Sequence, residues 1–252
     1  MPHFGNEHLH KITNKMIEDY QATRIRSHYR RGGKINPVSE ATINREICCI
    51  TVIFKKAVEW GRLADSPAQA VKTLKEKPNP TRLLEQYEIA RFLDAIPDRL
   101  KALIACTVYA GFRRSELFHL HWKDINWTTR ELDVVSRRGH HTKNYESRRI
   151  PMNDALIEAL RRHPRHINSP YIFCNAKGEP LKHVRTALRY AAKRAGIEDT
   201  VKMHQLRHAF CSHALMQRID PCTVQKWMGH KDLNTTLRYA HVSPDHEKAA
   251  IQ

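Results

Sequence analysis

The chain has 252 residues, and its 43 lysines and arginines against 26 aspartates and glutamates give a formal net charge of +17 at pH 7. With 41% hydrophobic residues, 9 glycines and 12 prolines, the composition is typical of a globular protein and excludes a fibrous or low-complexity chain. So basic a surface attracts polyanions, which makes nucleic acid the first candidate partner and an anionic membrane the second.

The sequence carries no signal for export or membrane insertion. Its longest apolar stretches, such as residues 102–110, fall far short of the roughly 20 residues that cross a bilayer, and the N-terminal residues 1–5 have no apolar signal core. The six cysteines form no Cys-x-x-Cys pair, which is typical of reduced cysteines. We therefore expect no membrane partner, no disulfide and a cytoplasmic location, at the nucleoid when DNA is bound.

The first part of the chain predicts a small, all-helical domain. One helix is expected over residues 14–29. A second follows Ser39, which can cap it, and ends at Gly61, because apolar residues recur every three or four positions between them. These apolar residues are Ile43, Ile47, Ile50, Phe54 and Ala57. The charged segment 72–81 contains two prolines and is interpreted as a linker.

The second part of the chain predicts helices around one hairpin. The hairpin strands are expected at 132–135 and 148–152, joined by a polar segment that contains Gly139. The fold class is therefore mainly α with a small antiparallel β-sheet. The helices are expected near residues 85–95, 100–110, 155–162, 184–195, 203–217 and 222–228.

Several polar side chains could carry chemistry in this second part. Arg113 follows a buried helix, and Glu116 comes three residues later, where it can hold the guanidinium. His204 and Arg207 are three residues apart and share one helix face. The remaining candidates are Lys143 in the hairpin, His230 after a glycine, and Tyr239. Taken singly, each is typical of a surface charge, a cap or a packing residue.

A zinc site is an alternative interpretation of one helix. His204, His208 and Cys211 repeat at positions i, i+4 and i+7, a spacing that can ligate zinc. No fourth ligand has motif spacing, and a zinc-bound His208 would displace its neighbour Arg207 from the site. The sequence therefore favours a site without metal or other cofactor.

Together, the candidate side chains suit displacement at a phosphodiester. Two arginines supply paired donors to the non-bridging oxygens as charge develops on them. Histidines donate or relay protons, and a tyrosine hydroxyl becomes a nucleophile when its neighbours favour the phenolate. A lysine can protonate the leaving oxygen, and Lys143 is the only lysine between Glu131 and Met152.

Three stretches of the chain resemble the motifs of one enzyme family. They are Ala-Gly-Phe-Arg-Arg-Ser-Glu-Leu (110–117), His-Gln-Leu-Arg-His (204–208) and Met-Gly-His-Lys-Asp-Leu-Asn-Thr-Thr-Leu-Arg-Tyr (228–239). They look like the motifs of the tyrosine recombinases, the phage-integrase family. The resemblance implies a site-specific recombinase that cleaves and rejoins DNA strands through a 3′-phosphotyrosyl intermediate.

The resemblance also implies a role for each candidate residue. Tyr239 would be the nucleophile, Arg113 and Arg207 the phosphate clamp, Lys143 the general acid on the 5′ oxygen, His204 the acid/base partner of the tyrosine, His230 a donor to the scissile phosphate, and Glu116 a support for the site.

The first part of the chain resembles the helical core-binding domain of the same family. The similar stretches are residues 4–13 and 38–46. The resemblance implies a core-binding domain over 1–79, which begins after the position of its first helix, and an α+β catalytic domain over 80–252. No arm-binding domain is expected. The tail after Tyr239, which in the family docks on a neighbouring protomer, is expected to be short.

The partners that follow from the resemblance are double-stranded DNA and further copies of the chain. We expect a homotetramer on paired recombination sites, with accessory DNA-bending or directionality proteins, in viral genome integration or another mobile-element function. Two alternatives remain. A catalytically inactive or truncated DNA-binding regulator would use residues 215–239 as a helix-turn-helix. A type IB-like topoisomerase would use the same chemistry to relax DNA.

Overall fold

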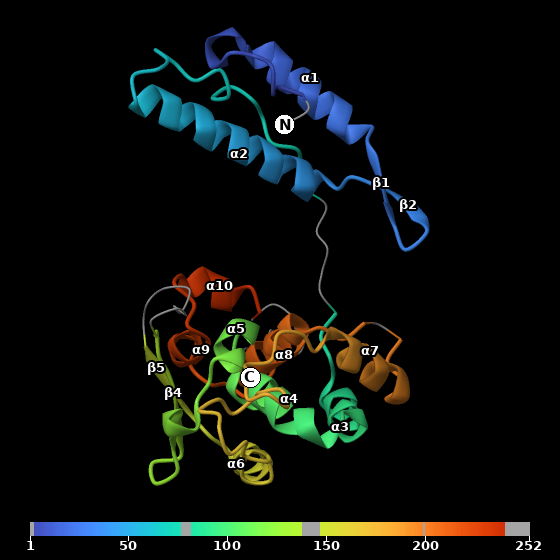
Figure 1. The fold of residues 1–252 in the computed structure, drawn as a ribbon, viewed down its shortest axis with the longest axis vertical. Helices are drawn as coiled ribbons and strands as arrows, with labels where there is room; N and C mark the ends of the chain where they lie inside the picture. Colours follow the sequence, from blue (N-terminus) through green and yellow to red (C-terminus); the bar gives the residue numbers. More distant parts are fainter. Residues whose placement is uncertain (1–2, 77–81, 138–146, 199, 240–252) are drawn as a thin grey trace, which may run out of the picture. The chain divides into compact units, whose positions relative to one another are not determined.

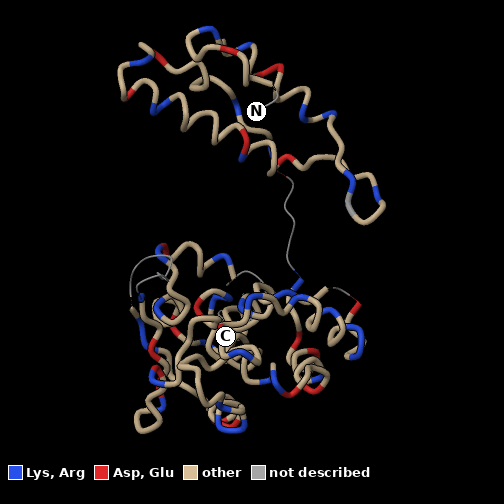
Figure 2. Tube along the Cα trace, viewed as in Figure 1, with Lys and Arg blue, Asp and Glu red and all other residues tan. Residues whose placement is uncertain are grey.

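The computed structural model describes residues 3–76, 82–137, 147–198 and 200–239. The chain separates into two compact units, Met1–Pro80 and Thr81–Gln252 (Figure 1). Each unit has its own apolar core. Lysines and arginines are spread through both units (Figure 2). In the described ranges, no helix combines the length and the apolar character that crossing a membrane requires.

Two α-helices build the first unit in its described residues. A 3₁₀ turn, η1 (Leu9–Lys11), precedes α1 (Asn14–Ile25), and α2 (Glu40–Glu59) packs against α1. The predicted second helix is confirmed: the Ser39 side chain caps α2, and the five predicted apolar residues are buried. An ion pair also joins the helices, because Arg24 donates from Nε and Nη2 to the two carboxylate oxygens of Glu46, at 2.8 and 2.7 Å.

The prediction of an all-helical first part is wrong between α1 and α2. The expected helix over 14–29 stops at Ile25, and β1 (His28–Arg31) pairs antiparallel with β2 (Lys34–Pro37). Gly32 and Gly33 form the two-residue turn, with φ of +59° and +78°. Two consecutive positive φ angles are what a type I′ hairpin turn needs, so the Gly-Gly pair was the available signal.

The second unit contains eight α-helices and a three-stranded antiparallel sheet in its described residues. The sheet has the order β3-β4-β5, which confirms the predicted pairing of its last two strands and adds a third. The short elements β3, α5, α10 and η2 were not predicted. The elements are α3 (Gln86–Ala95), α4 (Asp98–Ala110), α5 (Arg114–Phe118), η2 (Trp122–Asp124), β3 (Ile125–Asn126), β4 (Glu131–Val134), β5 (Arg148–Pro151), α6 (Asp154–Arg161), α7 (Arg185–Arg194), α8 (Met203–Met216), α9 (Pro221–Met228) and α10 (Leu233–Leu237).

Helix α4 is the centre of this unit, with α3, α6 and α8 packed against it (Figure 1). It ends at Gly111, whose φ of +62° places it in the left-handed region. A Cβ at this position would lie 2.5 Å from Phe210 Cδ1 and 2.7 Å from Met228 Sδ. A glycine is therefore required here by both backbone and packing, and it lets α8 and α9 close over the end of α4.

Candidate active site

The candidate site lies where four segments far apart in the sequence meet. The start of α5 supplies Arg113 and Glu116, α8 supplies His204 and Arg207, the end of α9 leads to His230, and the turn after α10 carries Tyr239. Every candidate from the sequence except Lys143 is brought to this region. Lys143 lies outside the described residues.

Arg113 is held in place at the beginning of α5. Its Nη1 donates to Glu116 Oε1 at 2.9 Å, which confirms the predicted pairing, and its backbone N–H donates to Glu116 Oε2 at 2.8 Å. Its Nη2 donates to the carbonyl oxygen of Gly229. The guanidinium is therefore fixed between α5 and the end of α9, and its side chain remains 22% exposed.

Arg148 on β5 is a site residue that was not predicted from the sequence. Its Nη1 and Nη2 donate to the two Glu116 oxygens at 3.0 and 2.8 Å, and its Nε donates to the carbonyl of Trp227 at 2.7 Å. Burial alone would raise the pKa of Glu116, but Arg148, with help from Arg113, holds that pKa below its ordinary value. Glu116 is thus an ionised carboxylate between two guanidiniums.

Arg207 is buried in α8, and backbone carbonyls hold its guanidinium. Its Nη2 donates to the carbonyl of Met228 at 2.6 Å, and its Nη1 donates to the carbonyl of Gly111. Burial and the nearby Arg113 charge lower its pKa to about 9, with Glu116 opposing this effect. The Arg207 guanidinium is therefore a buried cation that backbone dipoles orient. Its charge would be fully compensated only by an anion that binds from outside.

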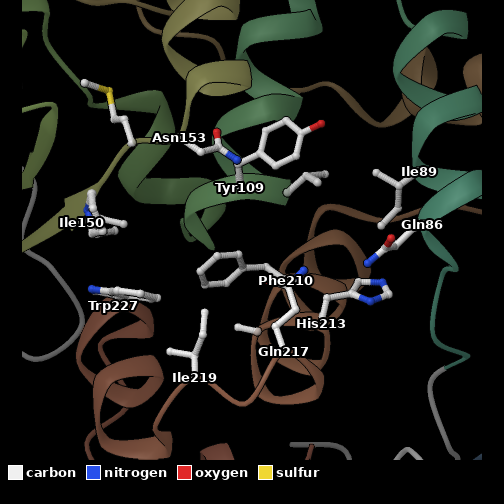
Figure 3. Close-up of a pocket in the computed structure, with 14 residues that line it drawn as sticks. Gln86, Ile89, Tyr109, Ile150, Asn153, Phe210, His213, Gln217, Ile219 and Trp227 are labelled. Carbon is white, nitrogen blue, oxygen red and sulfur yellow. The ribbon is translucent and has the colours of Figure 1, made fainter.

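Helix α8 has two different faces. Arg207 and His208 make the contacts of the site, to Gly111, Met228 and Tyr239. Phe210 and His213 instead line an apolar cavity of about 580 Å³ (Figure 3). In Figure 3, Phe210 points into this cavity opposite Trp227 of α9. His213 follows His208 by five positions, which is about 140° around the helix at 3.6 residues per turn. The helix therefore separates the polar site from an apolar cavity.

Tyr239 contacts the α8 face of the site through His208. Its hydroxyl lies 3.3 Å from His208 Nε2, and the two rings meet edge to face at 4.8 Å. Burial and nearby Cys211 raise the pKa of Tyr239, which Arg207 and Arg238 only partly offset. The phenol is therefore protonated at neutral pH, and it could act as a nucleophile only after a base removed its proton.

The three site imidazoles are all held neutral at neutral pH. Burial, followed by the charges of Arg207 and Arg113, lowers the pKa of His204, and it lowers that of His230 to about 4. Burial and the neighbouring His204 and Arg207 lower the pKa of His208 to about 4. His230 Nδ1 is 2.8 Å from the Thr236 hydroxyl, which ties it to α10.

The zinc interpretation finds no support in the described residues. Within those ranges, no three histidine, cysteine or acidic side chains come together as a metal site. His204 and His208 instead meet edge to face, with ring centroids 4.1 Å apart, and His208 faces Tyr239.

Residues 82–246 match the phage integrase family. Tyrosine recombinase XerC of Staphylococcus epidermidis is 31% identical, over 82% of this chain and 73% of its own length. The integrase of Salmonella phage P22 is 26% identical, over 94% of this chain and 65% of its own length.

Solved structures share the fold. The Tn1549 transposon integrase in complex with transposon right-end DNA superposes with a TM-score of 0.76 at 20% identity, over 97% of this chain and 86% of that one. The XerH site-specific recombinase, in a post-cleavage complex with its palindromic difH substrate, gives a TM-score of 0.73 at 19% identity, over 96% and 72%.

Proposed function

This chain belongs to the phage integrase family of tyrosine recombinases, enzymes that cleave and rejoin DNA strands, and we propose that Tyr239 is the nucleophile of that reaction. Its oxygen would attack the scissile phosphorus, and the bond from phosphorus to the 5′ oxygen would break. The products are a 3′-phosphotyrosyl bond and a free 5′ hydroxyl. The 5′ hydroxyl of another strand reverses the step and completes the exchange.

The placement of Arg113 and Arg207 is the observation that carries this proposal. Both donate to consecutive backbone carbonyls, those of Gly229 and Met228, directly before His230. Two guanidiniums fixed so close together form a preorganised receptor for the oxygens of one phosphate, which develop charge during displacement. His230 would donate to the same phosphate, and Glu116 would hold Arg113 in position.

Proton transfers complete the proposed mechanism. Lys143 would protonate the leaving 5′ oxygen, a step that arginine performs poorly because it stays protonated. His204 would act as the acid/base partner of Tyr239, as the family resemblance implies. The two arginines supply the electrostatic stabilisation that a metal ion supplies in other phosphoryl-transfer enzymes, so the reaction should proceed in EDTA.

The proposed substrate is duplex DNA, held by both units. Residues 1–79 would serve as the core-binding domain and residues 80–252 as the catalytic domain. The +17 charge supports this assignment because a duplex presents closely spaced phosphates. Four copies of the chain on two paired sites, with accessory DNA-bending or directionality proteins, would perform the exchange in the cytoplasm, at the nucleoid.

Covalent capture tests the proposal and identifies the target sequence in the same experiment. Duplexes with a randomised segment and a nick are incubated with the protein in EDTA, since loss of the short strand beyond the nick traps the adduct. The wild-type chain should form an SDS-resistant adduct, whose DNA reveals the site, and Tyr239→Phe should form none. An adduct that persists in Tyr239→Phe would overturn the assignment.

Two other results would identify the alternatives. DNA retention without any adduct would indicate a regulator without catalysis. Relaxation of supercoiled plasmids of any sequence would indicate a topoisomerase.

A further inference from the structure

We propose that the hairpin of β1 and β2 enters the major groove of duplex DNA, where Arg30 and Ile35 contact base edges. This inference rests on the proposed function, because it takes duplex DNA as the substrate. It goes further by naming an element that reads the sequence of that substrate. The hairpin belongs to the first unit and shares no residue with the candidate active site.

The hairpin has a fixed base and a projecting tip. Val38, the residue after β2, packs against the apolar core of the first unit, and its N–H donates to the carbonyl oxygen of Ser27 at 3.1 Å. Gly32 and Gly33 form the turn, and a Cβ at either position would meet nothing within 4 Å. The two strands extend beyond the ends of α1 and α2 (Figure 1). The tip is therefore open to a partner while the base is held.

Neither face of the hairpin is packed against a core. In the described residues, none of its side chains belongs to the apolar cluster of the first unit, and Tyr29 and Ile35 are 47% and 64% exposed. A two-stranded hairpin without a covered face is at best marginally stable in water. The burial that these two side chains lack in the folded chain would come from a partner.

The charge of the hairpin indicates an anionic partner. Arg26, Arg30 and Lys34 are exposed, and none of them forms an ion pair within the described part of the chain. Residues 20–39 contain no aspartate or glutamate that could compensate them locally. Arginines and lysines without acidic neighbours are attracted to the closely spaced phosphates of a duplex. Duplex DNA therefore fits the hairpin as a partner.

The dimensions of the hairpin favour the major groove. Paired strands lie about 4.8 Å apart, so a two-stranded ribbon with its side chains fits the major groove, which is about 12 Å wide, and not the minor groove, which is about 6 Å wide. The strand register places Arg30 directly opposite Ile35, so both side chains project from one face. Arginine pairs with O6 and N7 of guanine, and an apolar side chain contacts the methyl group of thymine. We therefore expect this pair to read a guanine and a thymine on the same or neighbouring base pairs.

Lys34 is expected to contact the DNA backbone instead. It lies next to the turn, on the face opposite to that of Ile35, because successive residues of a strand alternate between the two faces. When the Arg30 face is turned to the bases, Lys34 is directed away from them, where its charge can reach a phosphate. Phosphate contacts add affinity without sequence preference. Arg30 should thus confer sequence preference, and Lys34 affinity alone.

Selection by binding tests the inference without requiring cleavage. The full chain retains duplexes with a randomised segment, and the retained sequences are compared between the wild type and Arg30→Ala. The wild-type set should contain a guanine position whose preference disappears in Arg30→Ala, with affinity for the wild-type site reduced about 10-fold or more. The control is Arg62→Ala, an exposed arginine beyond the far end of α2, which should keep the preference. Unchanged preferences in Arg30→Ala, or equal weakening on every sequence, would overturn the inference.

Base analogues locate the two contacts at the selected positions. A 7-deazaguanine lacks the N7 acceptor, so it should weaken binding by the wild type and not by Arg30→Ala. Uracil in place of thymine lacks the methyl group, so it should weaken binding by the wild type and not by Ile35→Ala. If each analogue weakened the variant as much as the wild type, other side chains would make these contacts and the assignment would be wrong.

The dependence of binding on salt separates Lys34 from Arg30. Lys34→Ala should weaken binding equally on selected and unrelated duplexes, and should reduce the slope of log affinity against log salt by about 1. The control is Lys55→Ala, an exposed lysine on α2, which should keep the wild-type slope. Loss of a base preference in Lys34→Ala would contradict the orientation of the hairpin.

Removal of the hairpin tests the element as a whole. Ser27 and Val38 are already joined by a hydrogen bond, so an Asn-Gly turn can replace residues 28–37. The shortened chain should keep the urea unfolding midpoint of the wild type and lose the guanine preference. If it does not fold, Arg30→Ala and Ile35→Ala decide the question, because both positions are exposed and their substitution should leave stability unchanged.

Two further results have separate meanings. Absence of an adduct in the wild type, with an Arg30-dependent base preference, would overturn the proposed function and leave the hairpin as a DNA reader. Self-association that is lost in Ile35→Ser, with DNA binding unchanged, would make the hairpin a contact between copies of the chain and would overturn the inference.

Discussion

The two arginines of the proposed phosphate clamp are held in opposite ways. Arg113 belongs to an ionic network in which Glu116 lies between it and Arg148. Arg207 is held by the backbone carbonyls of Gly111 and Met228. Both guanidiniums lie beside the turn after α9. Arg113 has a carboxylate partner, whereas backbone carbonyl dipoles orient Arg207.

This difference gives the two arginines different properties: the Arg113 pair is well positioned, and Arg207 keeps an uncompensated charge. A carboxylate partner fixes Arg113 and offsets part of its positive charge, so the pair contributes geometry. Backbone carbonyls orient Arg207 without cancelling its charge, and burial makes that charge costly. Arg207 therefore contributes more to the binding energy of an arriving phosphate. The Arg113 network contributes more to the stability of the folded protein.

Arg207→Lys should have the largest effect of the substitutions that test this comparison. A lysine keeps the charge but cannot span two carbonyls and still donate to phosphate, so we expect adduct formation to slow by about 100- to 1000-fold. Salt-dependent DNA affinity should change little. Normal cleavage with weaker binding would instead place Arg207 among the general DNA-contacting charges. Arg162→Lys, an exposed position at the end of α6, is the control.

Arg148→Met should mainly affect stability. It leaves Glu116, whose side chain is 2% exposed, without its bidentate partner, and breaking such a buried pair costs about 3 kcal/mol. Urea unfolding measures the loss. The neighbouring Arg149→Met is the control, because the Arg149 side chain is 70% exposed and its pair with Asp133 is worth about 0–1 kcal/mol. An equal loss of unfolding free energy in Arg148→Met and Arg149→Met would show that the buried Glu116 pair stabilises the protein no more than an exposed pair.

Gly229→Ala should disturb both arginines of the ionic network at once. Its φ is +61°, and a Cβ would lie 3.1 Å from Arg148 Nη1 and 3.2 Å from Arg113 Nη1. We expect a destabilisation of about 1–2 kcal/mol from the left-handed backbone, together with slower adduct formation. Gly61→Ala shares the positive φ but meets nothing within 4 Å, so it should lose stability only. Thermal unfolding and the adduct rate, measured side by side, separate the two effects.

As the pH falls, the histidines around Arg207 should lose their contribution to stability before Glu116 of the Arg113 network loses its own. His208 and His230 have folded-state pKa values of about 4 against an ordinary value of 6.5, so the unfolded chain binds protons that the folded chain does not. Their contribution to stability is complete above pH 6.5 and is lost as the pH falls toward 4. The pKa of Glu116 is also lowered, and its contribution is lost only below its ordinary value of 4.5.

Urea unfolding at several pH values measures this effect. His208→Asn and His230→Asn should each reduce the dependence of unfolding free energy on pH between 6.5 and 4. A pH dependence identical to that of the wild-type chain in both variants would contradict neutral imidazoles around Arg207.

Much of the fold could be predicted because its signals are local. The apolar period and the Ser39 cap define α2, and Gly111 and Gly229 end α4 and α9 in the left-handed region. The β1–β2 hairpin was missed because the helical pattern was extended across residues 26–29, although Gly32 and Gly33 carried a turn signal. Capping, period and turn chemistry depend on neighbours in sequence, so a single sequence contains them.

The sequence by itself also determined which side chains meet, since the family motifs named Arg113, Glu116, His204, Arg207, His230 and Tyr239. The role of Lys143 stays a prediction. Only the tertiary structure decided how the charges are distributed and which histidine reaches Tyr239. Arg148 joins Glu116 across 32 residues, and His208 meets Tyr239 across 31. Helical spacing places His204 and His208 on one face but cannot rank them, because that choice depends on where a distant turn returns to the helix.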